Sequence, residues 1–338
     1  MTHSPKTPSS LVILKSNPMI TNPENQIRGV IYGHAIGDAL GLGTEFMSKA
    51  TIAHHYPQGL SHYDQIIQDT HRARFKIGDW TDDTDQMLCI FDSLLALKRF
   101  DTLDIARRIY QWGADGAPDI GQTVHSVLIA PGFLENPHKV AQSYWESTGK
   151  YMAANGGVMR TSILGVWEYH DLEKVAFHAQ EACKITHYDP RCILSCQIIS
   201  LFIARLLQGE SDIPTLLNEL KESYASKDPR VLEYFNKALD KNIAPLELGE
   251  SRSMGYTLKA MSTGTWALQN ATSFKEGLLA IIHEGGDADT NAAVAGPLLG
   301  ARFGYSSIPS EWIDGLKEKD ALESRIHELL NKRSGISL

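Results

Sequence analysis

A chain of 338 residues, 43% of them hydrophobic and 21% charged, has enough apolar material to build a core without disulfides or a structural metal. Its formal net charge of -8 argues against general nucleic-acid binding and against an anionic membrane surface, since both favour basic proteins. Four cysteines in a chain of this length exclude a disulfide scaffold, and the N-terminus lacks a basic segment followed by a long apolar one. We therefore expect reduced thiols and a cytoplasmic protein.

Residues 1–25 differ from the rest of the chain and predict an extended, partly disordered arm. They contain four prolines among Ser, Thr and Asn residues, with one apolar patch from Leu11 to Leu14. Two interpretations stay open for this arm: a disordered tail, or a segment that docks on the body or on a partner protein. The remainder, residues 26–338, is expected to form one domain.

From Ile27 onward the pattern of apolar residues is helical. In residues 84–98 and 172–183 they recur at positions that share one helix face. Residues 192–207 are nearly apolar, but they are too short to span a bilayer and are interrupted by polar residues, which favours a buried central helix. Because no window shows several strands at regular spacing, we predict an all-α fold, a single compact multi-helix domain.

The segment GHAIGDALGLGTEF, residues 33–46, combines recurring glycines with two acidic residues. Gly33 and Gly37 share one face of the expected helix, which lets another helix or a ligand approach the backbone closely. Of these two, we favour a close helix–helix contact. Glu45 follows the glycine-rich stretch, and it could act as a general acid, a general base or a metal ligand.

Two short acidic clusters lie far apart in the chain, and each precedes an apolar, helix-like run. They are GDWTDDTDQM (78–87) and EGGDADTNAA (284–293). Asp and Thr at a helix start commonly cap free N–H groups, and for one cluster alone that interpretation would be an equal alternative. Adjacent carboxylates such as Asp82 and Asp83 repel, however, unless a cation compensates. Carboxylates with Thr hydroxyls form an all-oxygen ligand set, which suits Mg²⁺, Mn²⁺ or Ca²⁺ rather than Zn²⁺.

The motif NGGVMRTS (155–162) suggests a contact with an anionic ligand. Asn155, Gly156 and Gly157 precede an apolar run, where we expect a turn at a helix start. The N–H groups of such a turn suit a phosphate, although an ordinary helix–helix turn has the same composition.

The motif THYDP (186–190) carries a histidine that could donate a hydrogen bond to a phosphate. An alternative is a Zn²⁺ site made of His187, Cys192 and Cys196, but the sequence offers no fourth ligand. Because the two cysteines are four residues apart on an apolar helix, we assign them to the core instead.

Taken in order, these segments resemble the ADP-ribosylglycohydrolase family, which includes the dinitrogenase reductase-activating glycohydrolases and the ADP-ribosyl-acceptor hydrolases. The matching strings are GHAIGDALGLGTEF, GDWTDDTDQM, NGGVMR, THYDP and EGGDADTNAAVAGPLLGARFG, with a weaker match at GYTLKAMSTGTWAL (255–268). The pairing of TDDT with a distant DADT is specific, whereas no single segment is. The resemblance covers roughly residues 28–305 and leaves out the arm.

The resemblance implies an all-α fold with a cleft that holds two Mg²⁺ or Mn²⁺ ions. The implied metal ligands are Thr81, Asp82, Asp83, Asp287, Asp289 and Thr290. Glu45 corresponds to the family's mobile glutamate near the scissile bond, and either Glu45 or Asp83 would transfer the proton. The residues expected to line the pyrophosphate are Asn155, Gly156, Gly157 and His187, with Met159 and Tyr256 near the substrate.

The implied reaction is hydrolysis of the glycosidic bond between ADP-ribose and an acceptor side chain of a modified protein, and we expect arginine as the acceptor. Two alternatives stay open. One is a hydrolase for serine-linked or O-acetyl-ADP-ribose. The other is an immunity protein that binds and neutralises an ADP-ribosyltransferase toxin, partly through residues 1–25. The complete set of predicted ligands argues against a purely structural protein, and no EF-hand loop indicates a generic Ca²⁺ binder.

Overall fold

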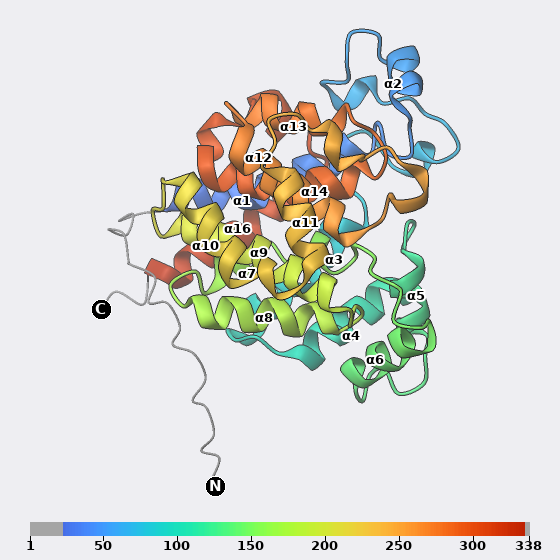
Figure 1. Cartoon of the computed structure of the whole chain (residues 1–338), viewed down its shortest axis with the longest axis vertical. Coiled ribbons are helices and arrows are strands. Elements are labelled where there is room, and N and C mark those ends of the chain that lie inside the picture. Colours follow the sequence, from blue (N-terminus) through green and yellow to red (C-terminus); the bar gives the residue numbers. More distant parts are fainter. Residues whose placement is uncertain (1–22, 335–338) are drawn as a thin grey trace, which may run out of the picture.

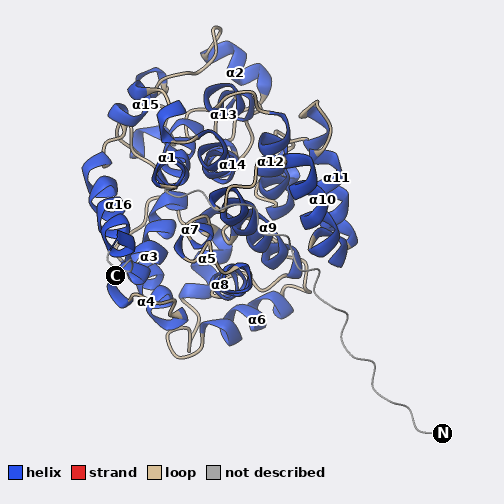
Figure 2. Ribbon diagram, turned by 90° about the vertical axis from the view of Figure 1, so that its left-hand side faces the viewer, coloured by secondary structure: helices blue, strands red, loops and turns tan. Residues whose placement is uncertain are grey.

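The computed structural model describes residues 23–334, and the side chains of residues 23–331. In that range the chain folds into sixteen α-helices, with no strand and one isolated antiparallel bridge between Ala154 and Tyr256 (Figures 1 and 2). The predicted all-α fold is confirmed. The expected arm lies almost wholly outside the described residues, and the first helix begins at Glu24, two residues before the expected domain boundary.

The helices follow one another through short loops and 3₁₀ turns. The α-helices are α1 (Glu24–Gly41), α2 (Lys49–His55), α3 (Asp82–Leu97), α4 (Thr102–Ala114), α5 (Gln122–Leu128), α6 (Pro137–Ser147), α7 (Leu164–Trp167), α8 (Leu172–Lys184), α9 (Pro190–Leu207), α10 (Ile213–Ser223), α11 (Pro229–Ala238), α12 (Thr257–Asn270), α13 (Phe274–Ile282), α14 (Ala288–Phe303), α15 (Ser310–Gly315) and α16 (Lys319–Ser334). The 3₁₀ turns are η1 (Tyr63–Gln65), η2 (Arg72–Arg74), η3 (Val158–Arg160), η4 (Ala225–Lys227), η5 (Ala244–Leu246), η6 (Ser251–Ser253) and η7 (Tyr305–Ser307).

Helices α1 and α14 lie side by side at the centre of the upper half of the molecule and run antiparallel (Figures 1 and 2). Their contact is made by small residues. A Cβ added to Gly33 would overlap the carbonyl oxygen of Gly296, and one added to Gly37 would overlap that of Ala292. The helix–helix interpretation of these glycines is therefore confirmed. Since the C-terminal end of α1 lies beside the N-terminal end of α14, the seam brings the residues after Gly41 close to those before Ala288.

Helix α9 is the buried central helix predicted for residues 192–207. It packs against α7, α8, α12 and α14. The expectation that this segment is too short to span a bilayer is wrong, because the helix begins at Pro190 and its 18 residues pass by length and composition, alone among the described helices. Since 83% of that stretch is buried inside the protein, it is nevertheless a core helix, as predicted. The helices predicted from residues 84–98 and 172–183 are also present, as α3 and α8.

Several helices begin at an aspartate whose side chain caps the first turn, as the sequence pattern favours. Asp171 accepts a hydrogen bond from the backbone of Lys174 at the start of α8, and Asp189 accepts one from Arg191 at the start of α9. Helices α3 and α14 differ, because the N-cap residue of neither, Thr81 or Asp287, accepts a hydrogen bond from the first turn with its own side chain. Capping therefore does not explain the two acidic clusters at these helix starts.

The expected helix start after Gly157 is wrong. The chain forms only the single 3₁₀ turn η3 and reaches the short helix α7 at Leu164. The physical reason is tertiary: Arg160 is fully buried and donates hydrogen bonds to distant partners, which holds the chain in a turn at this point.

Candidate active site

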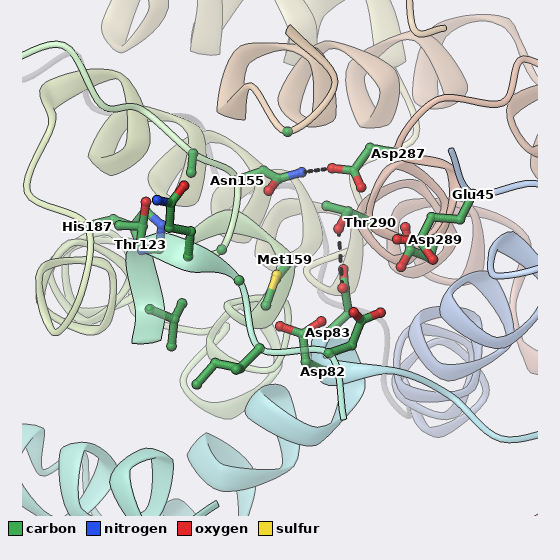
Figure 3. Close-up of a pocket in the computed structure, with 18 of the residues that line it drawn as sticks. Glu45, Asp82, Asp83, Thr123, Asn155, Met159, His187, Asp287, Asp289 and Thr290 are labelled. Carbon is green, nitrogen blue, oxygen red and sulfur yellow. Dashed lines mark hydrogen bonds between the residues drawn. The ribbon is translucent and has the colours of Figure 1, made fainter. Parts of the chain in front are cut away.

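A pocket of about 320 Å³ lies where the N-terminal ends of α3 and α14 meet the turn after α1. It has two chemically different sides, which Figure 3 shows facing each other. We call one the acidic wall, made of Glu45, Asp82, Asp83, Asp287 and Asp289. We call the other the neutral wall, made of Thr123, Asn155, Gly156, Met159 and His187.

Asp38 of α1 holds the start of α3. Its Oδ1 accepts hydrogen bonds from the Thr81 amide and hydroxyl at 3.0 and 2.8 Å, and its Oδ2 accepts from those of Thr84 at 2.9 and 2.6 Å. Asp38 thus satisfies the N–H groups that capping would have assigned to the cluster itself, which leaves Asp82 and Asp83 free to face the pocket. Thr81, an expected metal ligand, directs its hydroxyl to Asp38 and is absent from the pocket lining.

A double-glycine turn positions the second cluster before α14. Gly285 and Gly286 have φ values of 70° and 68°, a left-handed conformation that glycine adopts without steric cost. The turn places Asp287 just ahead of the helix and Asp289 in its first turn, and both carboxylates line the pocket. The Asp287 Oδ2 accepts a hydrogen bond of 2.5 Å from the Asn155 amide of the neutral wall (Figure 3).

The fold brings the two acidic clusters together, as the metal-site prediction requires. The Thr290 hydroxyl of the second cluster donates to the Asp83 Oδ2 of the first at 3.2 Å, across 207 residues of chain (Figure 3). Carboxylate oxygens of Glu45, Asp287 and Asp289 lie within 4.8 Å of one another. The structure therefore groups Glu45 with the second cluster, which the sequence pattern alone did not show.

Among the described residues, positive charge near the acidic wall is confined to residues behind it, such as Arg72, whose charge partly offsets the rise that burial causes in the pKa of Glu45. Burial raises the pKa of the Asp83 and Asp289 carboxyls well above the ordinary value, and neighbouring carboxylates raise it further. The Oδ1 atoms of both residues are buried with no hydrogen-bond partner among the described residues. No lysine or arginine of the described chain lines the pocket. Buried oxygens without donors and carboxylates without cations fit a site for Mg²⁺ or Mn²⁺ ions.

Glu45 lies in the turn after α1 and is almost fully buried. Burial raises the pKa of its carboxyl well above the ordinary value, and Asp287 is the largest of the charges that add to this rise. Its Oε2 lies 2.6 Å from His71 Nε2. Because Arg74 donates to His71 Nδ1, the ring proton of a neutral His71 lies on Nε2 and is donated to Glu45. His71 thus orients the glutamate from outside the acidic wall.

The neutral wall presents backbone and uncharged side chains to the pocket. Gly156 lies against His187: a Cβ added there would be 2.8 Å from His187 Cε1 and 3.2 Å from Nε2. Gly157, also expected at the pyrophosphate, faces the core instead, where an added Cβ would be 3.0 Å from Cys183 Sγ. Burial lowers the pKa of His187 to about 3, with Arg160 as the next cause, so the imidazole is neutral.

Tyr256, another residue expected to contact the substrate, lines an adjoining pocket of about 410 Å³ and not this one. Its hydroxyl accepts a hydrogen bond of 3.2 Å from Arg191 Nη1. The backbone beside it nevertheless reaches the site, because the carbonyl of the preceding Gly255 accepts from the backbone N–H of Asn155 at 3.0 Å.

The alternative Zn²⁺ site gains no support. Cys192 and Cys196 are fully buried in α9, and Cys192 Sγ donates to the Ala154 carbonyl. Neither cysteine belongs to a group of potential ligands close enough to share an ion in the described part of the chain. Both are core residues, as their spacing indicated.

Sequence reasoning did not assign a site role to Asp38, His71 or Asp119. Asp119 lines the pocket, and its charge is the largest contribution after burial to the raised pKa of Asp82. Asp38 stands between the glycines of the first motif, so its position was visible although its partners were not. His71 and Asp119 lie in loops without a recognisable motif, and nothing in the sequence pattern singles them out.

Comparisons with known proteins agree with this geometry. The family model described as ADP-ribosylglycohydrolase matches residues 19–336. The ADP-ribosylarginine hydrolase Tri1 of Serratia proteamaculans is 26% identical over 317 residues, which cover 90% of this chain and 79% of the relative. The ADP-ribosyl-[dinitrogen reductase] glycohydrolase of Rhodospirillum rubrum is 29% identical over 300 residues, with 88% and 92% covered. The ADP-ribosylhydrolase ARH3 of Mus musculus is 25% identical over 354 residues, with 92% and 93% covered.

A solved structure described as an ADP-ribosylglycohydrolase-related protein complex has the same fold, with a TM-score of 0.70 and 25% identity. The matched region covers 92% of this chain and 98% of the chain in the solved structure. The helical fold, the convergence of two acidic clusters and a family match over almost the whole chain lead to one conclusion. This chain belongs to the ADP-ribosylglycohydrolase family.

Proposed function

We propose that this protein hydrolyses the glycosidic bond between ADP-ribose and an arginine side chain of a modified protein, and that it requires two Mg²⁺ or Mn²⁺ ions. One observation carries the proposal: a buried acidic wall that lacks cations faces a neutral wall of hydrogen-bond donors across a single pocket. An ADP-ribose matches this polarity, because its distal ribose carries neighbouring hydroxyls for a metal site and its pyrophosphate accepts hydrogen bonds.

The residues expected to hold the ions are Asp82, Asp83, Asp287 and Asp289, with Thr290 and Glu45 beside them. Ions bound there would relieve part of the repulsion among the carboxylates and fix the ribose hydroxyls, which would align the reacting carbon. The protein then supplies negative charge around the oxocarbenium-like transition state of glycoside cleavage. A proton must move from the attacking water to the leaving nitrogen. Glu45 and Asp83 both have a raised pKa, so either carboxyl could hold that proton.

Arginine as the acceptor is supported by relatives named ADP-ribosylarginine hydrolase, which align with about nine tenths of this chain. Relatives named ADP-ribosylhydrolase ARH3, a name that specifies no acceptor, align as extensively. Serine-linked and O-acetyl-ADP-ribose therefore stay the competing substrates. The exposed Phe46, 57% accessible, lines the pocket beside Glu45, and its backbone N–H donates to the Gly286 carbonyl.

The test is release of free ADP-ribose from three defined substrates, ADP-ribosyl-arginine protein, ADP-ribosyl-serine peptide and O-acetyl-ADP-ribose, in Mg²⁺ and then in EDTA. Fastest release from the arginine substrate, abolished by EDTA and restored by Mg²⁺ or Mn²⁺, is the expected result. Faster release from another substrate would replace the proposed acceptor. Release that EDTA leaves unchanged would overturn the metal requirement.

The alternative of an immunity protein stays a prediction, because residues 1–22 lie outside the described part. Deletion of residues 1–22 is the variant that addresses it, since the first helix begins at Glu24. An arm that binds an ADP-ribosyltransferase predicts weaker binding of that enzyme with unchanged hydrolysis. Unchanged binding would leave hydrolysis as the whole function. We propose a cytoplasmic location for either function, since modified cellular proteins would be the partners.

A further inference from the structure

A fully buried arginine lies behind the pocket and connects its two walls. Arg160 of η3 is 0% exposed, although its guanidinium is always charged. Its Nη1 donates to Gln86 Oε1 at 2.7 Å, and its Nη2 donates to Thr186 Oγ1 at 2.6 Å and to the Ala182 carbonyl at 3.2 Å. All of these acceptors are neutral. The Arg160 guanidinium is therefore held in place by amide, hydroxyl and carbonyl oxygens. Gln86 stands between it and Asp82 of the acidic wall.

The hydroxyl of Thr186 transmits this arrangement to His187. It accepts from Arg160, and it lies 2.8 Å from His187 Nδ1. A threonine hydroxyl has one proton to donate, and His187 Nδ1 is the one acceptor that residues 23–331 offer it. The hydroxyl therefore donates to Nδ1, and the proton of the neutral imidazole lies on Nε2.

That Nε2 proton points to a place where the protein supplies no acceptor. His187 is 3% exposed and lines the pocket, and its Nε2 has no hydrogen-bond partner among the described residues. A buried N–H without an acceptor is costly, so such a group marks the position of a ligand oxygen. Figure 3 shows His187 across the pocket from Glu45 and Asp289, on the side expected to face a pyrophosphate.

The Nη1 atom of Arg160 is linked to the acidic wall through Gln86. Because Gln86 Oε1 accepts from Arg160, the amide of Gln86 is oriented with its NH₂ group toward Asp82. Gln86 Nε2 donates to Asp82 Oδ2 at 2.9 Å. That bond fixes one oxygen of Asp82 and leaves the other for the pocket.

We propose that Arg160 is a positioning residue for both walls: through Thr186 it sets His187 as an Nε2–H donor to a substrate phosphate, and through Gln86 it orients Asp82. The identity of the phosphate rests on the proposed function, whereas the tautomer of His187 does not. A single buried charge thereby aligns the binding of one end of the substrate with the geometry of the metal site at the other.

Thr186 offers a matched pair of variants that leave Arg160 and His187 in place. Thr186→Val replaces the hydroxyl by a methyl group of similar size, and Thr186→Ser keeps the hydroxyl. The imidazole tautomer is read from ¹⁵N chemical shifts of the metal-free full chain labelled at its 13 histidines. The His187 signals are identified by their loss in His187→Asn. We expect the Nε2–H tautomer in the wild type and in Thr186→Ser, and a mixture in Thr186→Val.

Binding is measured in parallel by calorimetry with free ADP-ribose. Thr186→Val should weaken it about five- to tenfold and Thr186→Ser should restore it, since one oriented hydrogen bond to an anion changes between them. For the contact through Gln86 to Asp82, the variant is Gln86→Met. It should weaken Mn²⁺ binding while the His187 tautomer stays that of the wild type. The positions of the variant side chains are buried, so each variant is first checked for a cooperative thermal transition.

Two results would overturn the proposal: an Nδ1–H tautomer in the wild type, or a Thr186→Val protein whose tautomer and ADP-ribose affinity equal those of the wild type. Unchanged Mn²⁺ affinity in Gln86→Met would contradict the part of the proposal in which Arg160 orients Asp82 through Gln86. A correct tautomer in a protein that hydrolyses none of the three substrates would contradict the proposed function and leave the positioning of His187 standing. The two failures are therefore distinguishable.

Discussion

The acidic wall and the neutral wall are both buried, yet they leave different kinds of atoms without a partner. In the acidic wall the unpartnered atoms are carboxylate oxygens, Oδ1 of Asp83 and of Asp289, and the surrounding charges repel one another. In the neutral wall the unpartnered atom is a ring nitrogen, His187 Nε2, which carries the ring proton in our proposal. The difference teaches that the two walls suit opposite partners: the carboxylate oxygens of one suit a cation, and the ring nitrogen of the other suits an oxygen that accepts a hydrogen bond.

Removing a carboxylate from the acidic wall should have the largest effect. Asp289→Ala deletes a carboxylate whose oxygen lies within 4.8 Å of those of Glu45 and Asp287. We expect release of ADP-ribose to fall at least about a hundredfold, because even outer partners of metal ligands change activity by that much. Asp320→Ala, an exposed residue of α16, is the control. Wild-type turnover in Asp289→Ala would exclude this residue from the ion site.

The same residue allows the repulsion in the acidic wall to be measured as stability. Burial, Glu45 and Asp287 raise the pKa of Asp289 in the folded protein above its ordinary 3.8. A raised folded pKa means that its stabilising contribution is complete below about pH 3.8 and is lost as the pH rises through the raised value. In EDTA at pH 7.5, Asp289→Asn should therefore exceed the wild type in free energy of unfolding by about 1–2 kcal/mol.

Denaturant titrations at two pH values check this expectation. The advantage of Asp289→Asn should shrink near pH 4, where the wild-type carboxyl is already protonated because its pKa is raised, and saturating Mg²⁺ at pH 7.5 should favour the wild type. An advantage of equal size at both pH values would mean that Asp289 is not charged in the metal-free protein. The wild type would then have no repulsion for an ion to relieve.

A substitution in the neutral wall should lower affinity and leave the ion site intact. Gly156→Ala places a Cβ 2.8 Å from His187 Cε1, which forces the ring to move and disturbs its hydrogen bond with Thr186. We expect ADP-ribose to bind about tenfold more weakly, with Mn²⁺ affinity unchanged. Asp320→Ala on the exposed face of α16, which lies outside the pocket lining, is again the control. A parallel loss of Mn²⁺ affinity in Gly156→Ala would mean that the walls are not separable.

The smallest effect is expected outside both walls. Tyr256→Phe removes the hydroxyl that accepts from Arg191 in the adjoining pocket, and it leaves the backbone beside Asn155 in place. ADP-ribose affinity should change by no more than about two- to threefold in calorimetry. A larger loss would extend the substrate contact into that pocket and restore the role first expected of this tyrosine.

Much of the fold could be predicted from the sequence because periodicity and composition report burial directly. The helices at residues 84–98, 172–183 and 192–207 are of this kind, since each is defined by its own apolar face. The glycines of α1 are another, because closely spaced glycines on one helix face have few uses besides close packing.

The candidate site likewise has features that could be predicted from the sequence and features that could not. The convergence of the two acidic clusters was expected from the family resemblance, since repulsion within one cluster indicates a cation but does not say which distant segment shares it. The direction of individual side chains could not. Thr81 binds Asp38, and Gly157 faces Cys183, because partners far away in the chain decide which way each residue points. Arg160 was visible in NGGVMR, but its role depends on Gln86 and Thr186, which approach it only in the folded protein.

The glycine seam between α1 and α14 has a consequence for how such a pocket adapts to new acceptors. Since main-chain atoms of the two helices touch directly, no side chain is available there to be enlarged, shortened or exchanged. The separation between the turn that carries Glu45 and the turn that carries Asp287 is therefore a property of the backbone. Selection for a different acceptor can act on surrounding positions such as Phe46, Ile120 and Met152, while the spacing across the reaction centre is inherited unchanged.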